Sequence, residues 1–541
     1  MKMAPVLSYI HFYKLVCIYW TELIKYRINL ESMVNLMLNE EKNRLVNLIS
    51  IIKKLCNRLL EVSNKELQTE ILIKCQESAL VIGDSLEKCV YEYDIEAVKN
   101  SNIVLGLEKF CESIYLCTKK TIVQQDVINL VSDLDKIEQL IREIPVTYRI
   151  VFLPYKAAMW DSLESIWRAF YNDKRCETTV VPIPYFEANR KTNEWEAKYD
   201  GDKYPDYVPV TYFQDYLLGD KKPDVVFMHY PFDNINHVTT MHPAYFSEEL
   251  KKNCKKLAYV PYYVNAGFIS DVYIDLPLLH RADYLFFQSE RAKESCKGYD
   301  YYDRIQALGS PKFDKIIKLV NNRPAAPEDW DIDLTGKKAL MLNTTITDFL
   351  ENGELLMNKL RYLFDVVGDY NNLVIVWRPH PLLEGTVKAM RPQYIEKYTE
   401  LVNYYVQNNI GIFDESADIS TAIASCDGYI GSRYSSIIDL FEVSGRPIYL
   451  FDSKHIYNEQ LSKEAIKKSP EDVFLKKSEL GYFACEESYE YSIYDFMEDM
   501  INDKLVSIKK KQLEAVKDIA SNLDGTAGEK IHKFIIDDLD K

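Results

Sequence analysis

The first 145 residues carry a hydrophobic pattern with the period of a helix. Between Pro5 and Pro145 the sequence has no proline and only two glycines, so nothing there forces the chain out of a helix. One stretch shows the repeat clearly, with apolar side chains every three or four positions: Leu45, Leu48, Ile49, Ile52, Leu55, Cys56 and Leu59. The pattern predicts an all-helical accessory domain over residues 1–145, which could associate with another copy or position an acceptor. A coiled coil is disfavoured because the repeat is not sustained.

Short apolar runs replace this pattern from Tyr148 onward. Such runs are typical of strands that are buried on both faces of a parallel sheet. In the middle of the chain they cover residues 149–153, 179–181, 224–228, 257–260 and 284–287. Helical segments lie between them, as in a βαβ series. We therefore expect a first Rossmann-like domain over residues 146–322.

A second series of apolar runs follows a polar, proline-bearing linker at residues 321–333. The runs cover residues 339–342, 373–377, 411–413, 428–430 and 447–450. They predict a second Rossmann-like domain over residues 334–485, and the remaining residues, 486–541, are expected to form helices that pack back on the core. The predicted fold class is α/β, with two Rossmann-like domains facing a cleft in the glycosyltransferase-B (GT-B) manner after an N-terminal all-helical region.

Composition narrows the class of protein. The formal net charge of -16 is spread along the chain, which argues against a nucleic-acid partner. The 11 cysteines show no CxxC pair and no spacing typical of metal ligands, so we expect reduced thiols and no structural zinc. No cofactor and no dedicated metal site are expected, with a loosely bound magnesium ion as the alternative. The apolar start at residues 4–20 is interrupted by His11 and Lys14 and lacks a cleavage site. We expect a cytoplasmic protein whose first helix packs on its neighbours, with a peripheral anchor on the inner face of the membrane as the alternative.

The predicted strand at 373–377 is followed directly by Arg378-Pro379-His380-Pro381. Ligands of open α/β sheets bind at the carboxyl ends of the strands, and a guanidinium beside an imidazole suits a phosphate. We expect Arg378 to bind phosphate and His380 to take part in catalysis. The alternative is a rigid loop whose arginine pairs with a surface carboxylate.

A turn that contains glycine and ends in serines, at residues 431–436, precedes an apolar helix. It offers backbone amides, hydroxyls and the positive end of a helix dipole to an anion. Arg433, Ser435 and Ser436 therefore form a candidate pyrophosphate cradle. Ordinary helix capping by Ser435 explains the same pattern.

The order of these motifs resembles that of the CDP-glycerol glycerophosphotransferases, which build teichoic-acid-like polymers. The matching residues are Gly-Ser-Pro-Lys-Phe-Asp at 309–314, Arg-Pro-His-Pro at 378–381, Ser-Arg-Tyr-Ser-Ser at 432–436, Arg-Pro-Ile at 446–448 and Phe-Asp at 451–452. The resemblance spans about residues 148–480 and implies that Arg378 and His380 lie by the nucleotide pyrophosphate. It also implies further substrate-binding residues: Gly309, Ser310, Thr344, Thr345, Arg433, Ser435, Ser436 and Asp439.

One departure from the family concerns activation of the acceptor. Family polymerases have a His-Gly-Thr-Pro segment after a strand of the first domain, whereas residues 262–268 of this sequence contain no histidine. His229, just past the strand predicted at 224–228, is the candidate replacement base, because a pKa near neutrality suits proton removal from a hydroxyl. Asp233 would orient it. The alternative is that both are hydrogen-bonded loop residues, and a metal site is disfavoured because the histidine spacing matches no ligand pattern.

The resemblance implies a transferase that moves an alditol phosphate group from a CDP-alcohol such as CDP-glycerol to an acceptor hydroxyl and releases CMP. The implied partners are the nucleotide donor and a polymer, glycan or lipid-linked acceptor, and the N-terminal helices could form a homo-oligomer. Two alternatives stay open. One is a glycosyltransferase that uses a nucleotide sugar, and the other is a non-catalytic scaffold that retains the fold.

Overall fold

The computed structural model describes most of the chain. It covers residues 37–90, 102–189, 192, 194–265, 269, 271–327, 329–330, 332–368, 370–416, 418–432, 435–450, 485–486, 493–506 and 508–541. The expectations for the first helix and for Arg433 lie outside these residues. The chain divides into two compact units, residues 1–149 with 174–177 and residues 150–173 with 178–541, and each is described by itself.

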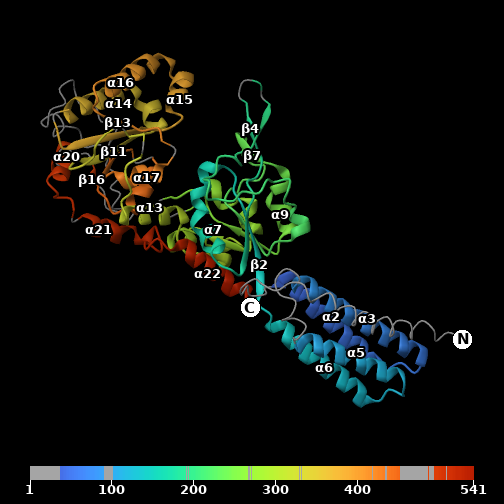
Figure 1. Cartoon of the computed structure of the whole chain (residues 1–541). Helices are drawn as coiled ribbons and strands as arrows, with labels where there is room; N and C mark the ends of the chain where they lie inside the picture. The colour runs from blue at the N-terminus through green and yellow to red at the C-terminus, as the bar shows by residue number, and fades with distance from the viewer. Residues whose placement is uncertain are drawn as a thin grey trace, which may run out of the picture. The chain divides into compact units, whose positions relative to one another are not determined.

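The first unit is helical, as its sequence pattern predicts (Figure 1). Its helices are α2 (Asn39–Arg58), α3 (Lys65–Val90), α5 (Asn102–Thr118) and α6 (Gln124–Glu143), preceded by the short strand β1 (Met37–Leu38). The apolar stripe of α2 faces inward, so that Leu45, Ile49 and Ile52 are fully buried in one core with residues of the other helices. Across the described parts of the chain, no helix has both the length and the apolar character that crossing a bilayer requires.

The first sheet of the second unit is parallel and has a Rossmann-like strand order. Its strands pair in the order β2 (Val146–Leu153), β6 (Val225–Met228), β8 (Lys256–Tyr259), β9 (Tyr284–Phe286) and β10 (Ile305–Gln306), with β3 (Cys176–Val180) pairing with β2. The strand order therefore reverses between β2 and β6. The helices of this domain are α7 (Glu164–Tyr171), α8 (Leu218–Lys221), α9 (Ser247–Asn253), α10 (Asp271–Ile274), α11 (Pro277–Arg281), α12 (Glu290–Glu294) and α13 (Pro311–Asn321). Short 3-10 helices lie at η2 (Ala157–Ser162), η3 (Pro243–Tyr245) and η4 (Tyr302–Arg304).

A small antiparallel sheet, which the sequence pattern did not predict, belongs to the same domain. It consists of β5 (Trp195–Lys198), β4 (Tyr185–Ala188) and β7 (Thr239–Met241) in that order. All four residues of β5 are exposed, so this strand carries no apolar run that would signal it.

The second sheet is also parallel and has the strand order of a dinucleotide-binding Rossmann domain. The order is β13 (Gly411–Phe413), β12 (Leu373–Pro379), β11 (Lys338–Thr344), β14 (Gly428–Gly431), β15 (Ile448–Leu450) and β16 (Cys485–Glu486). Counted from β11, this is 3-2-1-4-5-6, which reverses between β11 and β14. The surrounding helices are α14 (Ile346–Val367), α15 (Leu383–Met390), α16 (Ile395–Gln407), α17 (Ile419–Ser425), α18 (Ile437–Glu442) and α20 (Ile493–Ile501), with η5 (Pro392–Tyr394) before α16.

Side chains of this sheet fill two apolar layers, one on each face. Leu340, Leu342 and Ile375 belong to one layer, and their strand neighbours Met341 and Val376 belong to the other. Burial on both faces explains why the strands are continuous apolar runs. The predicted fold class, α/β with two GT-B-like Rossmann domains after an N-terminal helical region, is confirmed.

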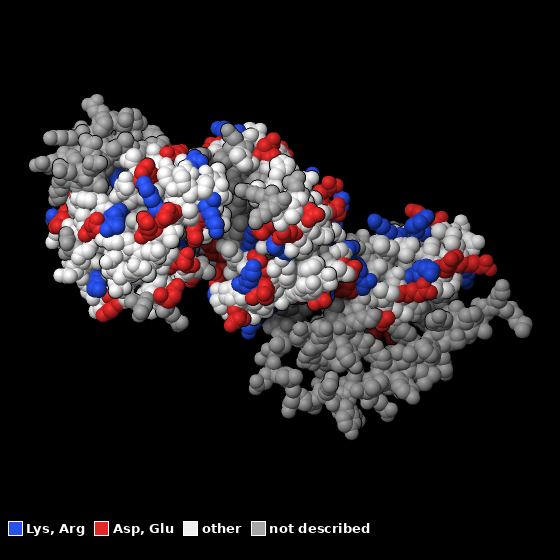
Figure 2. All heavy atoms as spheres, turned by 90° about the horizontal axis from the view of Figure 1, so that it is seen from above, with Lys and Arg blue, Asp and Glu red and all other residues white. Residues whose placement is uncertain are grey.

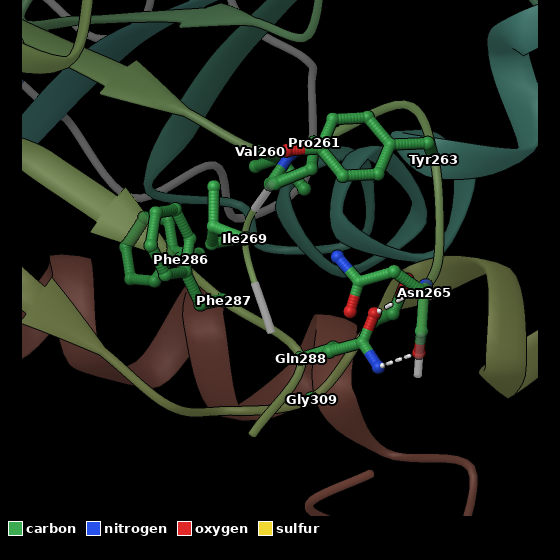
Figure 3. A pocket seen from close by; sticks show the side chains of 10 residues that line it. Val260, Pro261, Tyr263, Asn265, Ile269, Phe286, Phe287, Gln288 and Gly309 are labelled. Atoms are coloured by element: carbon green, nitrogen blue, oxygen red, sulfur yellow. Dashed lines mark hydrogen bonds between the residues drawn. The ribbon is translucent and has the colours of Figure 1, made fainter. Parts of the chain in front are cut away.

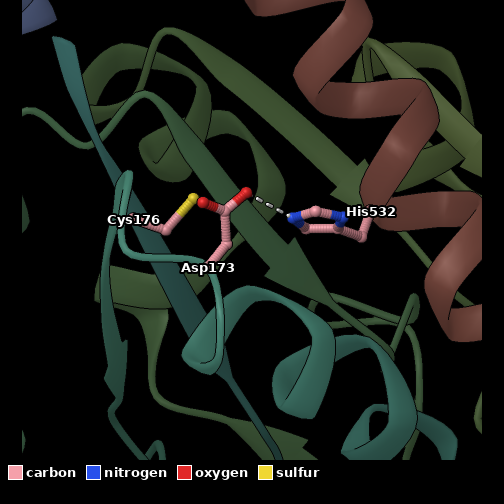
Figure 4. A group of neighbouring side chains, drawn as sticks. All are labelled: Asp173, Cys176 and His532. Carbon is pink, nitrogen blue, oxygen red and sulfur yellow. Dashed lines mark hydrogen bonds and ion pairs between the residues drawn. The ribbon is translucent and has the colours of Figure 1, made fainter. Parts of the chain in front are cut away.

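The last helices leave the second sheet and end on the first domain. After α21 (Ile508–Ala515) and η7 (Val516–Asp518), helix α22 (Ala527–Leu539) begins where the buried carboxylate of Asp314 accepts the backbone N–H groups of Ala527 and Gly528, at 2.9 and 2.8 Å. Further along α22, His532 Nε2 lies 3.0 Å from an oxygen of Asp173 (Figure 4). On the face that Figure 2 shows, acidic and basic side chains are interspersed over the described residues.

Candidate functional site

The carboxyl ends of three neighbouring strands meet where the order of the second sheet reverses. Asn343 of β11 stands opposite Arg378 of β12 on one side and Gly431 of β14 on the other. Open α/β sheets bind ligands at this switch point, outside the carboxyl ends of their strands. The motifs that the sequence places after three separate strands are therefore brought to one edge.

The β11 end supplies Thr344 and Thr345, and both hydroxyls have partners within the domain. Thr344 Oγ1 accepts a hydrogen bond from Trp377 Nε1 at 3.2 Å. Thr345 caps helix α14, because its hydroxyl accepts the N–H of Asp348 at 3.2 Å and donates to the carboxylate of Asp348 at 2.6 Å. These side chains fix the strand end and the helix start at this edge of the sheet.

Arg378 is buried and held by its own domain. Its guanidinium pairs with Asp414, and it donates to the hydroxyl and the carbonyl of Ser416 at 3.2 and 2.6 Å. The alternative interpretation was that this arginine pairs with a surface carboxylate. Arg378 does pair with a carboxylate, that of Asp414, but Asp414 is buried. Nε–H and one N–H of Nη2 have no hydrogen-bond acceptor among the described residues, and these are the groups that could reach a phosphate.

His380 is exposed at the same edge, and its backbone N–H donates to the carbonyl of Thr344 at 2.9 Å. Its Nδ1 accepts the N–H of Leu382 at 3.1 Å, which places the ring proton on Nε2. Partial burial of the ring lowers the pKa of His380 from its usual value. The neutral ring of His380 can therefore donate a hydrogen bond from Nε2.

The β14 end supplies the serines. Ser435 Oγ accepts the N–H of Ile437 at 3.2 Å, while the next residue, Ser436, is exposed and its side chain makes no capping bond to α18. The capping role considered for Ser435 is therefore present, and its hydroxyl hydrogen can still be donated. Asp439 lies in the first turn of α18 and is half-buried.

Gly309 and Ser310 lie at the first sheet. Gly309 has φ of 95°, and a Cβ at this position would lie 2.6 Å from the carbonyl oxygen of Ser521, so only glycine fits. Both residues line a small pocket beside Asn265 and Gln288, in which Gln288 hydrogen-bonds the backbone N–H and carbonyl of Asn265 (Figure 3). The buried hydroxyl of Ser310 has no partner among the described residues.

His229 is a buried, hydrogen-bonded residue of the first domain. It is completely buried, Nε2 accepts the N–H of Tyr155 at 2.7 Å, and Nδ1 lies 2.8 Å from the hydroxyl of Ser162. Burial lowers the pKa of His229 to about 3. With both ring nitrogens bonded and no exposed face, His229 has no open path to an acceptor hydroxyl in this conformation.

Asp233 does not orient His229, contrary to the expectation from the sequence. Its two oxygens accept the backbone N–H and the hydroxyl of Ser247, at 2.9 and 2.6 Å, and Arg281 lies 3.6 Å away. The reason is the turn after β6, where Asp233 has a positive φ of 47° and its carboxylate lies at the start of α9.

Two residues of the site were missed by the sequence reasoning. Asp414 directly follows the strand predicted at 411–413, so the rule that singled out Arg378 applies to it equally. Tyr429, inside β14, donates its hydroxyl to Asn343 Oδ1 at 3.4 Å, and no local pattern signals such a contact.

No protein-family model and no curated protein sequence match the chain. Several solved structures do match the chain. The UDP-GlcNAc 2-epimerase from Methanocaldococcus jannaschii, in complex with UDP-GlcNAc and UDP, is 15% identical over 72% of this chain and 99% of its own, with a TM-score of 0.41. The UDP-N-acetylglucosamine 2-epimerase from Rickettsia bellii is 11% identical over 73% and 97%, with a TM-score of 0.39. The lipopolysaccharide outer core galactosyltransferase WaaB is 12% identical over 72% and 99%, with a TM-score of 0.31.

Proposed function

We propose that this chain is a transferase that moves an alditol phosphate group from a CDP-alcohol, such as CDP-glycerol, to an acceptor hydroxyl and releases CMP. The observation that carries the proposal is the register of the second sheet, in which Asn343 pairs with both Arg378 and Gly431. It supports a single nucleotide site at the switch point. The order of motifs supplies the choice of donor, because it resembles the CDP-glycerol glycerophosphotransferases.

In this proposal the second domain binds the pyrophosphate by hydrogen bonds. Nε2–H of His380 and the two remaining N–H groups of Arg378 donate to phosphate oxygens, together with the hydroxyls of Ser435 and Ser436. The acceptor oxygen attacks the β-phosphorus, the bond between this phosphorus and the bridging oxygen breaks, CMP leaves and a proton is released. Donors fixed before the reaction stabilise the charge that develops on the phosphates.

The products distinguish this reaction from its alternatives. The purified chain is incubated with CDP-glycerol and, separately, with nucleotide sugars, in an extract that contains the native acceptor, and the nucleotides are separated by chromatography. We expect CMP from CDP-glycerol. Formation of UDP or GDP from a nucleotide sugar would instead establish glycosyl transfer, and no turnover with a demonstrated acceptor would establish a scaffold.

The serines provide an internal test of the site. Ser435→Ala with Ser436→Ala should slow CMP release about tenfold, or roughly 1.4 kcal/mol of transition-state stabilisation. The matched control is Ser63→Ala, because Ser63 is an exposed serine of the helical unit. Equal rates for the two variants would remove the serines from the site.

A further inference from the structure

Asp414 is a completely buried carboxylate at the edge of the second sheet. It follows β13 directly, and its backbone N–H donates to the carbonyl of Trp377 on β12 at 2.9 Å. One carboxylate oxygen pairs with Arg378. A carboxylate in this environment is stable only where several donors hold it.

The other oxygen of Asp414 has two donors. Trp330 Nε1–H lies 3.1 Å from Oδ1, and the backbone N–H of Ser416 lies 3.1 Å from the same atom. The backbone amide of Ser416 comes from the turn itself, two residues after Asp414. The indole comes from a distant part of the sequence.

Trp330 belongs to the segment that joins the two Rossmann-like domains. Its backbone N–H donates to Pro327 at 3.0 Å, and its carbonyl accepts the N–H of Ile332 at 2.8 Å, so a short turn holds it. The ring is buried in an apolar layer that also contains Phe313 of α13 and Ile412 of β13. An indole is a hydrogen-bond donor only, and its acceptor here is Asp414.

We infer that Trp330 is a positioning residue of the nucleotide site, which holds Asp414 so that Asp414 fixes the guanidinium of Arg378 for a pyrophosphate. This rests on the proposed function. Fixing a donor before the ligand arrives lowers the entropy lost on binding. The segment between the domains therefore contributes to donor affinity without touching the donor.

Trp330→Phe tests the inference because it removes the indole N–H while it keeps a buried aromatic ring, though a smaller one, and the Arg378–Asp414 pair. Binding of CDP and CMP is measured by calorimetry at a temperature where circular dichroism shows every variant folded. We expect the Kd for CDP to rise about three- to tenfold, less than the full loss of a hydrogen bond to a charged group, because the indole acts on the guanidinium only through Asp414. The affinity for CMP should change less, since CMP carries no pyrophosphate. The matched control, Trp195→Phe at a half-exposed tryptophan, should leave both affinities unchanged.

A second comparison shows whether Trp330 acts through Asp414. Asp414→Asn should weaken CDP binding further, and adding Trp330→Phe to it should change the Kd by less than about twofold, because the two residues act in one chain of contacts. If Asp414→Asn fails to fold, the Kd of the single Trp330→Phe variant for CDP still decides whether Trp330 positions the site. A purely structural role predicts a lower melting temperature with an unchanged Kd for CDP, and that result would overturn the inference alone. Absence of CDP binding to the unmodified chain would overturn the proposed function as well.

Discussion

The side chain of Asn343 donates to the backbone carbonyl of Arg378 at 2.9 Å, from the end of one strand to the end of the next. The same amide accepts the hydroxyl of Tyr429 from the strand on its other side, at 3.4 Å. One buried asparagine thus joins the three strand ends that make the switch point. A group so placed affects both stability and the geometry of the site.

Asn343→Leu keeps the size of this side chain but removes both hydrogen bonds. We expect it to lower the free energy of unfolding by about 2 kcal/mol, because the Arg378 carbonyl stays buried without this donor and the Tyr429 hydroxyl keeps only the carbonyl of Ser432, at 3.3 Å. Thermal unfolding gives the change in stability, and CDP calorimetry gives the change in the site. Asn408→Leu, at an exposed asparagine near the end of α16, serves as the control. Equal melting temperatures for the two variants would contradict the joining role of Asn343.

His380→Gln is a direct test of nucleotide binding at this edge. The side chain is exposed, so the fold should be unaffected, whereas loss of the imidazole should weaken CDP binding about tenfold, or about 1.4 kcal/mol. Arg378→Ala is less informative, since it would leave the Asp414 carboxylate buried without its cation and destabilise the domain by about 3–5 kcal/mol. His237→Gln, at an exposed histidine of the first domain, is the matched control. An unchanged Kd for His380→Gln would exclude this histidine from the site.

His229 should make the first domain sensitive to acid. Its pKa is lowered to about 3 in the folded chain, from about 6.5 when unfolded, so protonation favours the unfolded state. The stability that this histidine contributes is present above pH 6.5 and is lost as pH falls toward 3, by up to about 1.4 kcal/mol per pH unit.

Urea unfolding at pH 7, 6 and 5 checks this expectation. His229→Gln should flatten the pH dependence, and His237→Gln, at an exposed histidine, is measured beside it as the control. If His229→Gln instead kept the pH dependence of unfolding and abolished transfer, the histidine would be restored as a candidate base.

Two helical glycines should respond in opposite ways to alanine. A Cβ on Gly528 of α22 would lie 2.4 to 2.6 Å from atoms of Ser165, whereas a Cβ on Gly385 of α15 meets nothing within 4 Å. Gly528→Ala should therefore lower stability by about 1–3 kcal/mol through overpacking, and Gly385→Ala should raise it by up to about 1 kcal/mol. Thermal unfolding followed by circular dichroism measures both. A stable Gly528→Ala variant would show that α22 does not pack tightly on α7.

Sequence alone predicted the two sheets because their strands are buried on both faces. Each predicted apolar run, such as 224–228 and 373–377, overlaps an observed strand, here β6 and β12. The exposed strand β5 escaped prediction because its four residues carry no apolar pattern. Local pattern thus predicts an element only where burial dictates its residues.

The candidate site was predictable only in part. That Arg378 lies at the end of a strand is visible in the sequence, but its pairing with Asp414 depends on β12 and β13 being neighbours in the sheet. His229 was also predictable only in part. Its place after β6 suggested a side chain accessible to a substrate, but Tyr155 and Ser162 pack around it and it is completely buried. Partners that are distant in sequence decide whether a polar residue binds a ligand or supports the fold.

The contact of Asp314 with the start of α22 has a consequence for the order of folding. Residues Ala527–Leu539 belong to the first domain by their contacts, yet the ribosome synthesises them after the whole of the second domain. Domains usually fold as they emerge, the N-terminal one first. Here the second domain can fold while the first still lacks α22, with Asp314, and with Phe170 whose ring packs against His532, uncovered until Ala527–Leu539 have been synthesised. A chain released before Ala527 would present that unfinished surface to chaperones and proteases.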